Sequence, residues 1–83
     1  MIPLAAGASA GFWSCEPGRY EFVFDYDEFL YLIEGEVVIT GSGPAGHVHP
    51  LKAGESADIP QGLTTIWDVS RRLTKYFVAR APF

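Results

Sequence analysis

The chain has 83 residues, a formal net charge of −4 at pH 7 and a hydrophobic content of 48%. A chain of this length makes one small domain that buries about 60–65% of the surface its unfolded form exposes, so we expect it to form a homodimer. The acidic balance, without a basic stripe, argues against a nucleic-acid partner, and the single cysteine cannot form an internal disulfide.

The first residues carry neither a positively charged start nor a long apolar run, which predicts no signal peptide and no membrane span. We therefore expect a cytoplasmic protein. Residues 1–11 are rich in Ala, Gly and Ser and are expected to be a flexible leader, and residues 12–83 to be the single domain. The nine glycines and six prolines predict many turns, which is typical of an all-β protein with short strands.

The first expected strands cover 12–16 and 19–24, separated by the turn dipeptide at Pro17. Aromatic side chains alternate with other residues over 19–24, which is the period-two pattern of a half-buried strand. The hairpin signal is strongest over 28–40, where apolar and β-branched residues lie on both sides of Gly35. Because a glycine can take the positive φ of a tight turn, we predict two strands joined at Glu34 and Gly35.

Residues 41–46 are expected to form a loop because of their Gly, Ser and Pro content. Further short strands are expected over 47–52, 56–59, 63–69 and 73–79, with a turn at 70–72. No helical periodicity longer than one turn is present, so the whole pattern predicts a sandwich or barrel of jelly-roll type. The core is expected to contain Phe22, Phe24, Leu30, Leu32, Val37, Ile59, Thr65 and Trp67.

Two spacings resemble the signature motifs of the cupin family, whose fold is a double-stranded β-helix or jelly-roll barrel. In the first, six residues separate Glu28 from Gly35; in the second, Gly54, Pro60 and Gly62 follow one another with gaps of five and one. Over residues 12–80, Trp67 and Lys75 add a likeness to small single-domain cupins similar to the (S)-ureidoglycine aminohydrolase cupin domain. The resemblance implies an all-β cupin barrel.

Metal-binding cupins are expected to carry two histidines shortly before the motif glutamate and a third after the motif glycine. Here the first two positions are Phe22 and Phe24, or alternatively Glu21 and Val23, and the third is Thr65. Phenylalanine cannot ligate a metal, so we expect no metal cofactor. If a divalent metal did bind, Glu28 would be the one matching ligand.

The same resemblance points Glu28 into a pocket lined by Phe22, Phe24, Leu30, Thr65 and Trp67. A carboxylate there could act as general acid or base, or it could be a structural group paired with Lys75 or an arginine. Lys75 could point inward to Glu28 or an anionic ligand, or outward as a charge that protects a sheet edge.

Two further candidates are set aside. His47 and His49 have a spacing that metals can use, but they follow a loop and are expected to face solvent. Cys15 has no neighbouring base in the sequence, so a nucleophilic role is not expected.

Three functions remain open from the sequence. The first is a cupin that binds a small polar metabolite in its barrel without a metal. The second is an enzyme similar to ureidoglycine aminohydrolase, acting in nitrogen metabolism through Glu28 and Lys75. The third is a structural or interaction module whose barrel is filled by side chains.

Overall fold

The computed structural model describes residues 2–5, 8–41 and 47–80, so the predicted loop at 42–46 lies outside the described residues. The described chain contains no helix, and therefore none that could cross a membrane. The all-β prediction is confirmed. The strands are β1 (Ile2–Ala5), β2 (Ala8–Cys15), β3 (Gly18–Val23), β4 (Asp27–Gly41), β5 (Val48–Lys52), β6 (Ser56–Ile59) and β7 (Thr64–Arg80).

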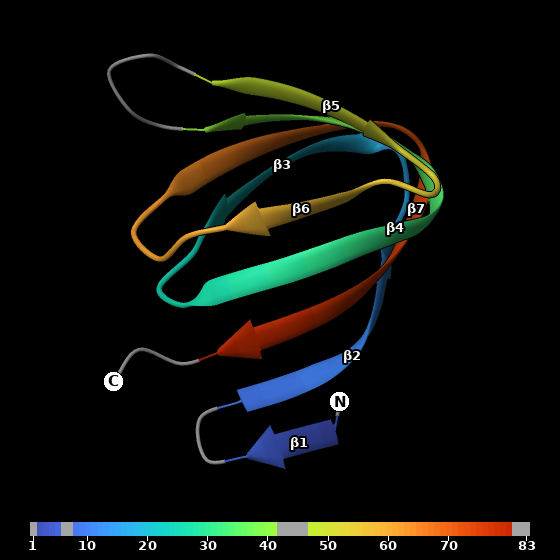
Figure 1. Ribbon diagram of the computed structural model, residues 1–83. Helices are drawn as coiled ribbons and strands as arrows, with labels where there is room; N and C mark the ends of the chain where they lie inside the picture. The colour runs from blue at the N-terminus through green and yellow to red at the C-terminus, as the bar shows by residue number, and fades with distance from the viewer. Residues whose placement is uncertain (1, 6–7, 42–46, 81–83) are drawn as a thin grey trace.

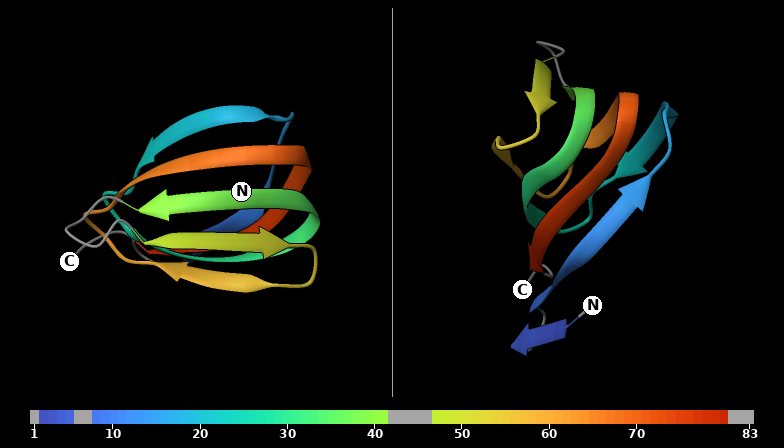
Figure 2. Two further views of the ribbon diagram at one scale, coloured as in Figure 1. Left: turned by 90° about the horizontal axis from the view of Figure 1, so that it is seen from above. Right: turned by 90° about the vertical axis from the view of Figure 1, so that its right-hand side faces the viewer.

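The two long strands β4 and β7 form the centre of the fold and pair with each other, antiparallel, on both sides of a bend. The first half of β4 lies between the second half of β7 and β6, and its second half lies between the first half of β7 and β5. β2 and β3 pair with opposite halves of β7, and β1 pairs with β2. The two halves of the sheet face each other across the interior (Figures 1 and 2).

The bend in β4 occurs at Gly35, and the predicted hairpin there is wrong. The residues on either side of Gly35 pair with β7 rather than with each other. Gly35 has the expected positive φ of 100°, but its role is close packing: a Cβ there would collide with the Arg72 carbonyl oxygen and lie 2.8 Å from Leu73 Cα. The predicted turn at 70–72 is likewise a bend inside β7.

The N-terminal part of the chain also differs from the expectation. The range 1–11, expected to be a leader, contains β1 and the first residues of β2. These residues have low strand propensity, but β2 pairs with β7 from Ala8, opposite Arg80, to Cys15, opposite Leu73. The backbone ladder with the long strand β7 therefore decides the conformation of β2, and β1 in turn pairs with β2.

The interior between the two halves of the sheet is filled by apolar side chains. The predicted core is largely confirmed, except that Phe22 is only half-buried. Thr65 is the buried polar member of the predicted set, with 1% of its surface exposed. The buried apolar cluster consists of Phe24, Leu30, Leu32, Val37, Ile39, Ile59, Trp67, Val69 and Leu73.

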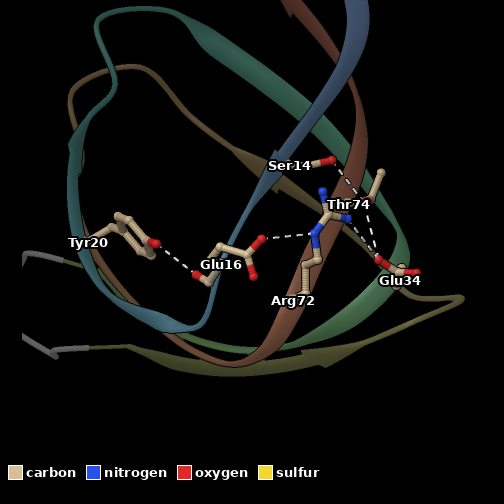
Figure 3. A network of polar contacts seen from close by, with 6 residues as sticks. All are labelled: Ser14, Glu16, Tyr20, Glu34, Arg72 and Thr74. Atoms are coloured by element: carbon tan, nitrogen blue, oxygen red, sulfur yellow. Dashed lines mark hydrogen bonds and ion pairs between the residues drawn. The ribbon is translucent and has the colours of Figure 1, made fainter.

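A polar network holds the bends of β4 and β7 to the connection between β2 and β3 (Figure 3). The Arg72 guanidinium lies 3.2 Å from a Glu16 carboxylate oxygen and 3.4 Å from a Glu34 carboxylate oxygen. Tyr20 donates a hydrogen bond of 2.7 Å to the Glu16 carbonyl oxygen. The charged side chains of this network, Arg72, Glu16 and Glu34, are exposed to solvent, so each ion pair contributes about 1 kcal/mol at most.

Aromatic side chains gather on the outer face of β2, β7 and β4. Phe12, Tyr76 and Tyr31 lie opposite one another across these three strands, and Phe12 is 71% exposed. The expected homodimer stays a prediction, and these aromatic residues alone do not establish a contact with a second copy.

The close approach at Gly35 makes a testable prediction for stability. We expect Gly35→Ala to lower the free energy of unfolding by about 3 kcal/mol or more, because a backbone clash adds to the strain of a positive φ. Gly54→Ala is the matched control: φ is 92°, nothing lies within 4 Å of the new Cβ, and the loss should be about 1–2 kcal/mol. Equal losses in urea denaturation would show that the bend tolerates a side chain.

Candidate functional site

The interior contains a buried ion pair between the two long strands. Lys75 Nζ lies 2.5 Å from Glu28 Oε2, and 9% and 3% of the two side chains are exposed. Glu28 stands opposite Ala79 and Lys75 opposite Leu32 on neighbouring stretches of β4 and β7. The lysine therefore points inward, which was one of the two orientations that the sequence left open.

Aromatic rings surround the Lys75 ammonium group. Its Nζ lies 4.9 Å from the centroid of Trp67, 5.1 Å from Trp13 and 5.5 Å from Phe77. Ring faces attract a cation and displace water from it. Trp13 reaches this position because it stands opposite Lys75 in the pairing of β2 with β7, a contact that the sequence pattern did not predict.

Tyr26 is a second partner of the Glu28 carboxylate. Burial raises the pKa of Tyr26, and the negative charges of Glu28 and Asp25 raise it further. The phenol therefore remains protonated beside the carboxylate. Sequence reasoning missed this contact, although residues two apart in extended chain share a face, and Tyr26 precedes Glu28 by two positions.

Thr65 occupies the position where the resemblance implies a histidine. Its hydroxyl donates to the Phe22 carbonyl oxygen at 3.1 Å and accepts a hydrogen bond of 2.9 Å from Trp67 Nε1. Phe22 stands opposite Thr65, and the Phe24 ring stacks on Trp67 at 6.5 Å. The position of the implied histidine is therefore occupied by a hydroxyl that already makes two hydrogen bonds, with two phenylalanine rings near it.

This donor set does not fit the metal centre that the fold family implies. Within the described ranges, no three His, Cys, Asp or Glu side chains come together to hold a metal ion. Glu28 already binds the Lys75 ammonium, and a hydroxyl with a single carboxylate is a poor site for zinc, iron or manganese.

A cavity of about 510 Å³ is lined by residues of β5, β6, the end of β4 and the start of β7. Its buried lining consists of Ile39, Ile59 and Thr65, and His47 and His49 are exposed members of the lining. Other lining residues are Gly41, Pro50, Leu51, Ser56, Ala57, Asp58, Pro60 and Leu63.

The predicted pocket residues are therefore divided between two places. Thr65 lines the cavity, whereas Leu30, Phe24 and Trp67 lie in the apolar cluster and Phe22 packs against that cluster. The sequence did not associate the two histidines with a cavity, because the other walls come from β6 and the start of β7, and the sequence pattern does not show that these strands lie beside β5.

The Cys15 thiol is not activated as a nucleophile. Burial raises the pKa of its thiol, which keeps it protonated. Since the thiolate is the nucleophile, this agrees with the expectation that Cys15 has no nucleophilic role.

The buried ion pair predicts a strong coupling between its two members. We expect Lys75→Met to lower the free energy of unfolding by about 3–5 kcal/mol, because Glu28 is left charged and without its ammonium partner. The double variant Glu28→Gln, Lys75→Met should recover a large part of this loss, as measured by urea denaturation.

The chain's other lysine provides a matched control. Lys52 is exposed, so Lys52→Met should change the free energy of unfolding by no more than about 0.5 kcal/mol. Strictly additive effects of the Glu28 and Lys75 substitutions would contradict the coupling.

With this geometry described, comparisons with known proteins can be considered. A protein-family model described as the EutQ-like cupin domain matches residues 4–77. A DUF861 family protein from Thermotoga maritima has a solved structure with 25% identity and a TM-score of 0.74, covering 81% of this chain and 74% of that chain. No functionally curated protein matches the chain.

Two solved EutQ structures are also similar. The EutQ protein of Clostridium difficile has 22% identity and a TM-score of 0.77, and the putative ethanolamine utilization protein Q of Salmonella typhimurium has 24% identity and a TM-score of 0.77. Each comparison covers 89% of this chain, which spans 56% of the first protein and 58% of the second.

Proposed function

Given that the chain belongs to the EutQ-like cupin domain family, we propose that it binds a small polar metabolite in its barrel without a metal ion. The cupin fold expected from the two motifs is confirmed. The observation that supports binding is the cavity of about 510 Å³. Sites for small ligands commonly have about 300–1,000 Å³ and combine apolar walls with a few polar groups.

The lining of the cavity has this combination. Ile39 and Ile59 provide buried apolar surface, and the Thr65 hydroxyl retains one lone pair after its two hydrogen bonds. The metal-free form of the proposal is supported by the donor chemistry around Thr65, where two phenylalanines and a hydroxyl replace the histidines of metal-binding cupins.

Filling the cavity should remove binding. Ala57 lines the cavity and stands opposite the buried Leu30, so Ala57→Phe should direct its ring into this space. In a thermal-shift screen of small polar metabolites, we expect hits that stabilise the native chain and fail to stabilise Ala57→Phe, because a ligand stabilises the state to which it binds.

The matched control is Ala53→Phe, at an exposed position in the turn before β6, which should keep every hit. Cooperative unfolding of Ala57→Phe verifies that the variant is folded.

The screen is run with a chelator; hits that need an added divalent metal would contradict the metal-free proposal. No hit from a broad panel would favour the third function, a filled structural module.

A second candidate is an enzyme similar to ureidoglycine aminohydrolase, supported by one specific contact. The Glu28 carboxylate accepts a hydrogen bond from Lys75 in the interior, and its charge raises the pKa of the nearby Tyr26 phenol, so a general acid or base, a phenol and a cation lie close together there. Because Lys75 already binds Glu28, this activity requires the substrate to displace the ammonium group from the carboxylate.

Ammonia release from ureidoglycine tests this candidate. If Glu28 transfers the proton, Glu28→Gln should lower kcat by about 100-fold or more, because general acid–base catalysis contributes about 10²–10⁴-fold. Tyr26→Phe, which keeps the carboxylate, should lower kcat by less. Equal turnover by the native chain and Glu28→Gln would refute the role of Glu28.

A further inference from the structure

We infer that the metabolite bound in the cavity carries a carboxylate, which His47 and His49 hold while its apolar part lies against Ile39 and Ile59. This inference rests on the proposed function and adds the chemical class of the ligand. It follows from which ionisable side chains turn toward the cavity and which turn away from it.

Strand pairing places both imidazoles on the inner face of β5. His49 stands opposite Ile39, and Leu51 stands opposite Val37. Directly opposed residues share a face of the sheet, and both β4 partners are buried in the interior. The inner face of β5 therefore continues from Leu51 to His49.

His47 extends this face by one more step. The Gly41 amide donates to the His47 carbonyl oxygen at 2.8 Å, so the ladder between β4 and β5 continues to this residue. The rings of His47 and His49 lie 6.0 Å apart between centroids, and both residues line the cavity. Two side chains with N–H donors thus stand next to each other at its exposed edge.

The acidic residue of the lining has the opposite orientation. Asp58 stands opposite Phe29, which is 41% exposed on the outer face, whereas its neighbour Ala57 stands opposite the buried Leu30. Alternation along β6 therefore turns the Asp58 carboxylate outward. Among the residues that line the cavity, the ionisable side chains on the inner face are the two imidazoles.

A carboxylate with a short apolar chain or ring matches this arrangement. Its two oxygens are acceptors for imidazole N–H groups, and a protonated imidazole makes the stronger, charge-assisted bond. Its apolar part would replace water against Ile39 and Ile59, which are each 5% exposed. An ammonium ligand would meet no free carboxylate on this face, since Glu28 binds Lys75.

The test uses pairs of probes that differ in one functional group: 3-phenylpropionate with 3-phenylpropanamide, and hexanoate with hexanamide. Each is titrated into the ¹⁵N-labelled chain with a chelator present, and the amide resonances of 47–49, 51, 57–59 and 63–65 are followed. We expect each acid to bind about tenfold more tightly than its amide, as a charge-assisted hydrogen bond would produce.

The variant His47→Gln, His49→Gln should reduce this preference to less than about twofold, because a glutamine amide cannot gain the proton that makes an imidazole a charge-assisted donor. Val48→Gln is the matched control: Val48 lies between the histidines, is 59% exposed and does not line the cavity, so it should keep the native preference. The dispersion of the amide spectrum verifies that each variant is folded.

Each other outcome overturns the inference. If an amide binds as well as its acid, if the double glutamine variant keeps the preference, or if the preference appears only with added zinc, the two histidines do not hold a carboxylate directly. In those cases small-molecule binding itself still stands.

If no probe shifts these resonances while other metabolites of the thermal-shift panel do, the carboxylate class is wrong and the proposed function stands. If nothing binds in either experiment, both fail.

Discussion

The close approach of two bent strands at Gly35 is the constraint on which the rest of this structure depends. β4 and β7 are paired on both sides of their bends, so they must turn at the same place to stay paired. The space between them leaves no room for a Cβ beside the Arg72 carbonyl oxygen. A glycine with positive φ meets both requirements, because it adds no side chain and adopts this backbone readily.

The bend creates an interior with two different ends. Near the bends, exposed ion pairs of Arg72 cover the connection between β2 and β3 (Figure 3). At the other end, β5 and β6 pair with the two halves of β4 on its side away from β7, and each has β4 as its one partner among the described strands. The interior is therefore filled by apolar residues and a buried ion pair, and its open end contains the cavity.

The buried pair of Glu28 and Lys75 shows why a position in a motif does not by itself assign a role. In metal-binding cupins the glutamate is expected to be one ligand among several. In this chain its carboxylate binds an ammonium group instead and lies beside a tyrosine phenol. Three aromatic rings around the lysine make this arrangement compatible with burial, because they provide attraction to the cation where water is excluded.

Sequence patterns predicted several features of this molecule well. Alternation along 19–24 identified the inward residues of β3, and the spacings after Glu28 and Gly54 identified the barrel. The same patterns were ambiguous where two structures share one local signal. A glycine between two apolar stretches is typical both of a hairpin and of a bend, and only the pairing with β7 distinguishes them.

The sequence by itself determined the fold class, most of the core and the absence of the histidines that a metal-binding cupin would carry, because these depend on residue type and on a period of two. The tertiary structure alone decided the inward orientation of Lys75, the contact of Trp13 with it, and the place of His47 and His49 beside the cavity. The contacts of Lys75 and Trp13 depend on which residues far apart in the chain stand opposite one another, and the place of the histidines depends on how β6 and β7 lie beside β5. A local sequence pattern contains no information about either.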